Sequence, residues 1–487
     1  MGEQILVLDA GTTSTRAMIF DAQGRMLNVA QAELTQHYPR PGWVEHDAGE
    51  IWRKTHSCVR KVLPGDVTAI AAIGITNQRE TVVAWDKMSG EPLTRAIVWQ
   101  DRRTASFCED LRKKGHEAEV QRRTGLVLDP YFSGTKMRWM LDNDEAVRGA
   151  AQNGSLAFGT VESWLLFKLS GGAHLSDASN ASRTLLLPLD GKQFDEGLCD
   201  LFDVPRAALP EVIDTHGKLC ETDPALFGSV IPVCGLVGDQ QSATIGQGCL
   251  SVGETKATYG TGAFVLSNRG SELPRSDHRL LGTVLYQEAG RRVFAVEGAC
   301  FVAGSLIQYL RDQLGLIETA AQTEDLARSI EDSGEVVIVP ALAGLGAPHW
   351  LPDARGVISG LSFASGRAQV ARAALEAMAH QTHDLASAFA ADGAHWTSLR
   401  IDGGMSANDW MVQDIANMLD LPVERPAFVE TTALGAAMLA GTGCGLFASL
   451  EEAAGAMRGE VGTFAPRMAE DERAERLTRW RAALRAA

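Results

Sequence analysis

The amino-acid sequence predicts an α/β protein in which two similar domains flank a central cleft. The chain has 487 residues, of which 45% are hydrophobic and 22% are charged. This composition is typical of a globular protein with two or more domains. Apolar runs of strand length alternate with helical stretches in both halves. Moreover, two segments about half a chain apart follow one plan: a strand, a Gly/Thr turn and a second strand.

The first of these segments opens the chain. Ile5–Leu8 is an apolar run that leads through the turn Asp9–Thr15 into a second apolar run, Ala17–Phe20. Two such runs on either side of a Gly- and Thr-containing turn predict a β-hairpin.

The second segment repeats this plan in the middle of the chain. Glu254–Tyr259 leads through Gly260–Gly262 into Ala263–Leu266. No Pro- or Ser-rich linker separates the halves, so we place the boundary near Gly246–Val252. The predicted domains are residues 1–246 and 247–487.

The hydrophobic pattern predicts further elements. The expected strands are Ala69–Ile75, Val82–Trp85, Ala96–Trp99, Leu156–Phe158, Val336–Val339 and Leu399–Ile401, and the expected helices are Glu162–Leu169, Gln369–Asp384 and Trp410–Leu419. The uncharged stretch Thr431–Leu450 fits a buried helix of small residues better than a membrane span. The Arg-, Glu- and Ala-rich tail Glu470–Arg485 is typical of a solvated surface helix.

Charge and cysteine usage narrow the class of protein. The net charge is −16, with 61 acidic and 45 basic side chains, which argues against a nucleic-acid partner because such binding relies on Lys and Arg. The eight cysteines form no CxxC pair, as expected for reduced thiols. The N-terminus lacks the features of a signal peptide. We therefore expect a cytoplasmic protein without a transmembrane segment.

A polar segment, Thr76–Thr81, directly follows the predicted strand Ala69–Ile75 and contains Arg79 next to Glu80. The carboxyl ends of strands are where ligands bind in open α/β sheets. A cation beside a carboxylate can both donate hydrogen bonds to the hydroxyls of a polyol and accept them. The alternative is a solvated ion pair in a loop.

The two hairpin turns are candidate phosphate sites. Gly with Thr and Ser lets backbone N–H groups and hydroxyls converge on phosphate oxygens, and Asp9 is placed to hold Mg²⁺ through water. Each turn alone is equally compatible with an ordinary hairpin. The sequence contains neither a GxxxxGK[ST] loop nor a GxGxxG fingerprint, so neither of those routes to a nucleotide is supported.

Two further segments carry candidate residues. Ile401–Asn408 places two glycines between a strand and a helix, where backbone amides can approach a nucleotide; the alternative is a plain strand-to-helix turn with a polar cap. Asp239 follows Gly238 at a strand end and precedes Gln240. A carboxylate there can orient a substrate hydroxyl or take its proton during phosphoryl transfer, although an Asp beside Gly is often only a turn residue.

Together these segments resemble the FGGY carbohydrate kinases, and the resemblance runs from Ile5 to Ala437. Within the family the chain is similar to the members that phosphorylate glycerol. The segments that carry the resemblance are His37–His46, Asn77–Glu80, Trp99–Arg103, Asp129–Lys136 with Trp139, Gly238–Gln241 and Gly356–Leu361 leading to Glu376. Pentulose and hexulose kinases typically carry a Gly-Gln-Met-His-like segment where this chain has Asn-Gln-Arg-Glu.

The resemblance implies a pair of actin-like, ribonuclease-H-like ATPase domains and the phosphorylation of glycerol to sn-glycerol 3-phosphate with ATP and Mg²⁺. It assigns Asp239 as the base and Asp9 to the metal. The implied glycerol-binding residues are Arg79, Glu80, Tyr131, Asp239, Gln240, Phe264 and Trp99. The implied nucleotide-binding residues are Thr12, Thr13, Ser14 and Arg16 in one domain and Thr261, Gly304, Gln308, Gly404 and Asn408 in the other.

Other expectations stay open at this point. A homo-oligomer, either a dimer or a tetramer, is expected. An ATPase of the same fold that forms filaments or acts as a chaperone is the competing class, and a kinase of another small polyol is the nearer alternative. Regulated members carry an Arg-bearing loop before the position of Ile231, but residues 219–230 contain no Arg or Lys. Inhibition by a sugar bisphosphate is therefore not expected.

Overall fold

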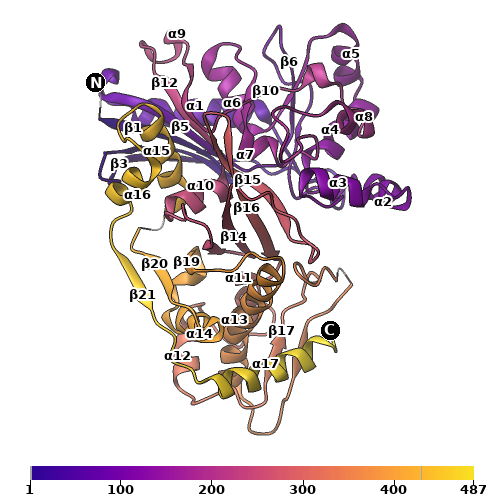
Figure 1. The fold of residues 1–487 in the computed structure, drawn as a ribbon, viewed down its shortest axis with the longest axis vertical. Helices are drawn as coiled ribbons and strands as arrows, with labels where there is room; N and C mark the ends of the chain where they lie inside the picture. Colours follow the sequence, from indigo (N-terminus) through magenta and orange to yellow (C-terminus); the bar gives the residue numbers. More distant parts are fainter. Residues whose placement is uncertain (1–2, 352, 429) are drawn as a thin grey trace.

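Two large β-sheets organise the chain in a computed structural model that describes residues 3–351, 353–428 and 430–487 (Figure 1). The first sheet has six strands in the order β11 (His216–Glu221), β12 (Pro232–Gly238), β5 (Ile70–Asn77), β1 (Gln4–Ala10), β2 (Ser14–Phe20) and β3 (Met26–Glu33). β1, β5 and β12 are parallel, whereas β2 and β3 continue from β1 as an antiparallel meander.

The second sheet has seven strands in the order β15 (Leu281–Glu288), β16 (Arg291–Cys300), β14 (Ala263–Gly270), β13 (Glu254–Tyr259), β19 (Ser398–Asp402), β20 (Val423–Pro426) and β21 (Val461–Phe464). Its hairpin β13–β14 is flanked by the parallel strand β19, as β1–β2 is flanked by β5. Both predicted hairpins are confirmed, and so is the α/β fold class with a repeated plan.

Short sheets and helices complete the architecture. The two-stranded sheets pair β4 (Glu45–His46) with β7 (Ala96–Ile97), β6 (Val83–Asp86) with β8 (Leu156–Gly159), β9 (Leu175–Asp177) with β10 (Glu211–Ile213), and β17 (Val337–Val339) with β18 (Val357–Ser359). The helices are α1 (Ala48–Val62), α2 (Ala105–Lys113), α3 (Glu117–Thr124), α4 (Ser133–Asn143), α5 (Glu145–Asn153), α6 (Val161–Ser170), α7 (Ala178–Ala181), α8 (Glu196–Leu201), α9 (Pro224–Phe227), α10 (Asp239–Gly246), α11 (Gly304–Asp312), α12 (Gln322–Arg328), α13 (Arg367–Ala391), α14 (Asp409–Leu419), α15 (Thr431–Gly443), α16 (Leu450–Met457) and α17 (Glu470–Leu484).

The central strands β1, β5 and β12 of the first sheet are buried on both faces, which explains their continuous apolar runs. Leu6 and Leu8 of β1 pack in a core that includes residues of α1 and α6. Ile5 and Val7, on the opposite face, pack in a core built with α15. Alternate side chains of one strand thus fill two separate cores.

Helix α15 comes from the second half of the chain but packs on the first sheet (Figure 1). Its contact with α10 depends on glycine: a Cβ on Gly435 would lie 1.9 Å from the carbonyl oxygen of Ser242, and one on Gly246 would lie 2.0 Å from that of Thr431. The predicted buried helix of small residues is confirmed over Thr431–Gly443, whereas the rest of the predicted stretch to Leu450 is not part of this helix. The domain division at residue 246 stays a prediction.

The tail is less solvated than its composition predicts. Within α17, Trp480 is fully buried and donates a hydrogen bond through Nε1 to Asp384 at 2.8 Å. Arg476 is also buried and forms an ion pair with Asp414 of α14 at 2.6 Å. The predicted helix is confirmed and most of its residues are exposed, but it is not simply solvated, because the face with Arg476, Leu477, Trp480 and Ala483 is buried.

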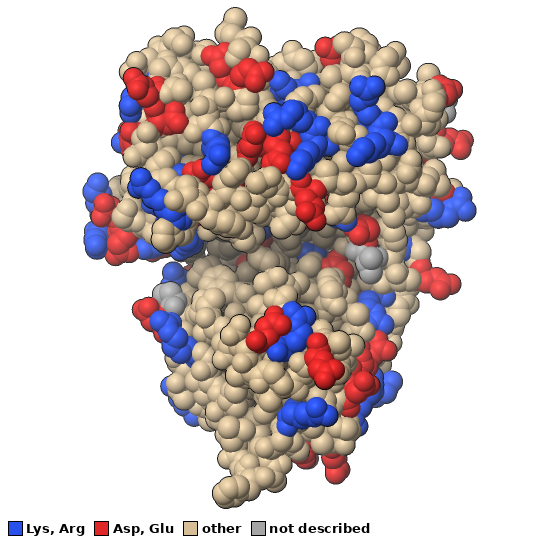
Figure 2. All heavy atoms as spheres, turned by 180° about the vertical axis from the view of Figure 1, so that it is seen from behind, with Lys and Arg blue, Asp and Glu red and all other residues tan. Residues whose placement is uncertain are grey.

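The surface of the molecule carries both signs of charge and a hollow. From behind, the surface is hollowed between the upper and lower bodies, and acidic and basic side chains are interspersed on the visible face (Figure 2). All eight cysteines are free thiols, and most are buried. None of the helices in the described ranges combines the length and apolarity needed to span a bilayer.

Candidate active site

Three parallel strands of the first sheet end at one edge and bring the predicted residues together. Ala10 of β1 pairs with Asn77 of β5, which pairs with Gly238 of β12. The residues that follow are the first hairpin turn, Arg79 with Glu80, and Asp239. The ends of β1 and β12 are about 10 Å apart, or two strand spacings.

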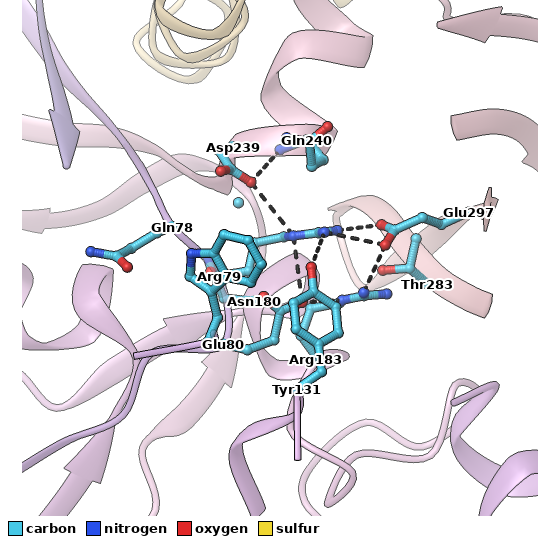
Figure 3. A network of polar contacts seen from close by, with 12 residues as sticks. Gln78, Arg79, Glu80, Tyr131, Asn180, Arg183, Asp239, Gln240, Thr283 and Glu297 are labelled. Atoms are coloured by element: carbon cyan, nitrogen blue, oxygen red, sulfur yellow. Dashed lines mark hydrogen bonds and ion pairs between the residues drawn. The ribbon is translucent and has the colours of Figure 1, made fainter. Parts of the chain in front are cut away.

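Arg79 lies at the centre of a buried polar network (Figure 3). Its Nη1 donates to Glu297 at 2.5 Å, and its Nη2 donates to the hydroxyl of Tyr131 at 3.0 Å. Its Nε lies 3.5 Å from both Glu80 and Asp239. The side chain is only 2% exposed, so the alternative of a solvated ion pair is wrong.

Asp239 begins helix α10, and its backbone position is set by the strand end at Gly238. Its Oδ1 accepts a hydrogen bond from the backbone N–H of Gln240 at 2.7 Å, and 32% of its side chain remains exposed. Burial raises the pKa of Asp239 to about 6, while Arg79 lowers it, Glu80 raises it and Lys256 lowers it. The carboxylate is thus accessible and has a pKa close to neutral pH, as a general base requires.

The other predicted substrate residues surround this pair. Trp99 and Tyr131 pack edge to face with ring centroids 5.6 Å apart, and both are partly buried. Gln240 accepts a hydrogen bond from Lys256 at 2.7 Å. Phe264 is opposite Ala299 in the β14–β16 pair, so it lies on the same sheet face as Glu297.

The first hairpin turn is linked to this site through Thr12. The indole Nε1 of Trp99 donates to the hydroxyl of Thr12 at 2.9 Å. Thr13 is exposed, and Ser14 is partly buried. Arg16 forms ion pairs with two carboxylates, those of Asp9 at 2.5 Å and of Glu430 at 2.6 Å. Its predicted contact with phosphate therefore requires that its N–H donors be divided between these carboxylates and the phosphate.

The carboxylates do not form a cation site by themselves. Among the described residues, no group of three or more His, Cys, Asp or Glu side chains is arranged to hold a metal ion. Burial raises the pKa of Asp9, whereas the neighbouring Arg16 acts to lower this pKa. The one carboxylate of Asp9 is compatible with Mg²⁺, because that ion commonly keeps several waters and is held by one or two carboxylates and by substrate phosphates.

The second domain contains a cavity of about 460 Å³. All five nucleotide-binding residues predicted for this domain line it: Thr261, Gly304, Gln308, Gly404 and Asn408. The wall also includes Ala320, Ala321 and Arg311, which the sequence did not indicate. Asn408 also caps α14 by accepting a hydrogen bond from the N–H of Met411 at 2.9 Å. The capping alternative is therefore correct for this side chain, although it does not exclude a role at the cavity.

Three buried charged residues of the network were not predicted. Glu297 and Lys256 lie within strands of the second sheet, and Arg183 follows α7. Each is no more than 1% exposed. A single charged residue within an apolar run, such as Glu297 in Val293–Cys300, is the signal that could have identified one of them.

Comparison with known proteins assigns the chain to a class. Sequence models of the FGGY family of carbohydrate kinases match it, the N-terminal domain over residues 4–246 and the C-terminal domain over residues 255–444. The chain belongs to this family.

Relatives of the chain carry a more specific name. It is 52% identical to a glycerol kinase of Rhodospirillum centenum, over 100% of this chain and 98% of the relative. It is 51% identical to a glycerol kinase of Rhodospirillum rubrum, over 99% and 98%. Its structure is similar to that of a Plasmodium falciparum glycerol kinase with ADP, with a TM-score of 0.95, 32% identity and coverage of 100% and 99%.

Proposed function

We propose that this protein is an enzyme that phosphorylates glycerol with ATP and yields sn-glycerol 3-phosphate and ADP. The observation that carries the proposal is the network of Arg79, Glu80, Tyr131 and Asp239 at the end of β5 and β12. It offers donors and acceptors in fixed positions beside an accessible carboxylate. Neither a filament subunit nor a peptide-binding chaperone needs such a group.

The geometry supports separate roles for these side chains. Arg79 donates to substrate hydroxyls, and Glu80 accepts from them. Tyr131 and Gln240 add polar contacts, while Trp99 and Phe264 cover the carbon face. Asp239 accepts the proton of the terminal hydroxyl or orients that hydroxyl toward the γ-phosphate. Positioning of the nucleophile in this way is the main contribution of the base in phosphoryl transfer.

The cavity and the hairpin turns are the features that we assign to nucleotide binding. The second-domain cavity takes the nucleoside, since Thr261, Gly304, Gln308, Gly404 and Asn408 line it and the Plasmodium relative was solved with ADP. Thr12, Thr13, Ser14 and Arg16 contact the phosphates. When bound, Mg²⁺ neutralises charge on the phosphate oxygens, and Asp9 is the residue that would hold it through water. The cytoplasmic location and the homo-oligomer stay predictions.

The test is a coupled assay of ADP release with glycerol, dihydroxyacetone, erythritol and xylulose as acceptors. We expect the highest kcat/KM with glycerol and loss of turnover when a chelator removes divalent cations. ADP release that does not respond to glycerol would refute the kinase assignment. A higher kcat/KM with erythritol would leave the class intact but change the substrate.

A further inference from the structure

Glu297 and Arg183 complete a closed ring of charges with the substrate-facing pair (Figure 3). Arg183 donates through Nε to Glu80 at 2.8 Å and through Nη2 to Glu297 at 3.0 Å. Glu297 in turn accepts from Arg79 at 2.5 Å. All four side chains are at most 2% exposed. Two arginines and two glutamates therefore alternate in a buried, charge-balanced ring.

The ring fixes which atoms of Arg79 are free to face the catalytic carboxylate. Both terminal nitrogens of Arg79 point to Glu297, at 2.5 Å and 3.3 Å. Only Nε faces Asp239, and at 3.5 Å that contact is long. A fork-to-fork pair between Arg79 and Asp239 would tie up both oxygens of the base, and Glu297 is the group that competes for the fork.

We propose that Glu297 and Arg183 are positioning residues, which hold the terminal nitrogens of Arg79 on Glu297 and Tyr131 and prevent Arg79 from pairing closely with Asp239. This inference rests on the proposed function. Glu297 remains charged throughout the working range: burial raises its pKa, but Arg183 and Arg79 lower it to about 2. The charged groups that face Asp239 itself are Arg79 and Glu80 beyond β5 and Lys256 on β13.

Two substitutions in the ring separate this role from a purely structural one. Glu297→Gln removes a negative charge and releases the fork of Arg79, so the pKa that governs the acid limb of kcat/KM for glycerol falls. Arg183→Met removes a positive charge of similar size, so the same pKa rises. We expect shifts of about 0.5–1 unit in opposite directions, since a neighbouring charge moves a pKa by about 1–3 units at direct contact.

Two controls keep the result interpretable. Arg183→Lys retains the charge and should leave the acid limb at its wild-type position. Asp414→Asn breaks the buried Arg476–Asp414 pair on the far side of the second domain and should lower thermal stability without a change in the pH profile. Circular dichroism establishes that each variant is folded.

The outcomes are distinct. Opposite shifts support the proposal. Unshifted acid limbs in folded Glu297→Gln and Arg183→Met, even with reduced kcat, refute it. If Arg183→Met does not fold, the direction of the shift in Glu297→Gln still decides, because a shift to higher pH contradicts the proposed competition. If the wild-type protein shows no glycerol-dependent ADP release, the proposed function fails instead.

Discussion

Replacement of Asp239 by Asn tests the proposed chemistry most directly. The substitution keeps the size of the side chain, and its oxygen can still accept the N–H of Gln240, which donates at 2.7 Å in the wild type. The ion pair that is lost, to Nε of Arg79, is long at 3.5 Å. Little ground-state binding should therefore disappear, and the glycerol Kd should change by less than about fivefold, or about 1 kcal/mol.

The rate should respond much more strongly. Loss of a general base commonly costs about 10²–10⁴ in rate, so kcat should fall at least about a hundredfold. Burial raises the pKa of Asp239 to about 6, so about nine-tenths of the wild-type carboxyls are ionised at pH 7. Wild-type kcat/KM should decline below about pH 6, and the residual activity of Asp239→Asn should lack this limb. The assay is coupled ADP release from pH 5 to 8.

A kcat for Asp239→Asn within about threefold of the wild type, well short of the expected loss, would remove this residue from the base role. The same conclusion would follow if both proteins showed the same acid limb. In either case Asp9 would be the next carboxylate to test, since it lies one residue before the end of β1, two strand spacings from β12 at the same edge of the sheet.

Three further predictions concern other parts of the molecule. Arg79→Lys keeps the charge but loses the guanidinium fork that reaches Glu297 and Tyr131. The KM for glycerol should therefore rise about tenfold or more, with the KM for ATP nearly unchanged. Equal rises in both KM values would mean that Arg79 serves the nucleotide site or the stability of the fold. Gly404→Val should raise the KM for ATP about tenfold. A Cβ at this position meets no atom within 4 Å, so the protein tolerates it, but the larger side chain fills the cavity, and overpacking costs about 1–3 kcal/mol. Gly455→Val, at a position that is equally open, is the matched control. Burial raises the pKa of Glu162 from 4.5 to about 7, which Ser176 and Thr160 oppose. This carboxyl should therefore stabilise the fold fully below about pH 4.5 and lose that contribution as the pH rises through about 7. The free energy of unfolding, measured in urea, should decline less over this interval for Glu162→Gln than for the wild type. Equal slopes of unfolding free energy against pH in the two proteins would contradict the assignment.

Local pattern was sufficient to predict the elements that frame the site. The apolar run Ile5–Leu8 lies within β1, and the run Ala69–Ile75 lies within β5 except for its first residue, since β5 begins at Ile70. Each run is followed by the polar residues that the chemistry needs. Strand ends could be located because hydrophobic periodicity stops there. The Ala96–Trp99 prediction extended too far: β7 ends at Ile97, and the N–H of Trp99 donates to the hydroxyl of Thr81 at 3.2 Å.

Long-range partners could not be predicted in this way. Glu297 is 218 residues from Arg79 in the sequence, and nothing near either residue indicates that they meet. The same holds for α17, where Arg476 pairs with a carboxylate 62 residues away. In both cases a charged side chain is buried because a partner from a distant segment neutralises it, and hydrophobic pattern carries no information about such partners.

The placement of Lys256 and Glu297 explains why residues of both halves build one reaction centre. Lys256 is opposite Leu266, which is opposite Glu297, so all three lie in one row on one face of the second sheet. The two charged members of this row hold Gln240 and Arg79 at the carboxyl edge of the first sheet, at 2.7 Å and 2.5 Å. The cavity that we propose for the nucleotide lies in the same second domain. The sheet that carries the cavity therefore also contacts the polar network at the edge of the first sheet. Under the proposed function, these contacts between rigid elements fix the distance between the substrate hydroxyl and the γ-phosphate, as close alignment of two reactants requires.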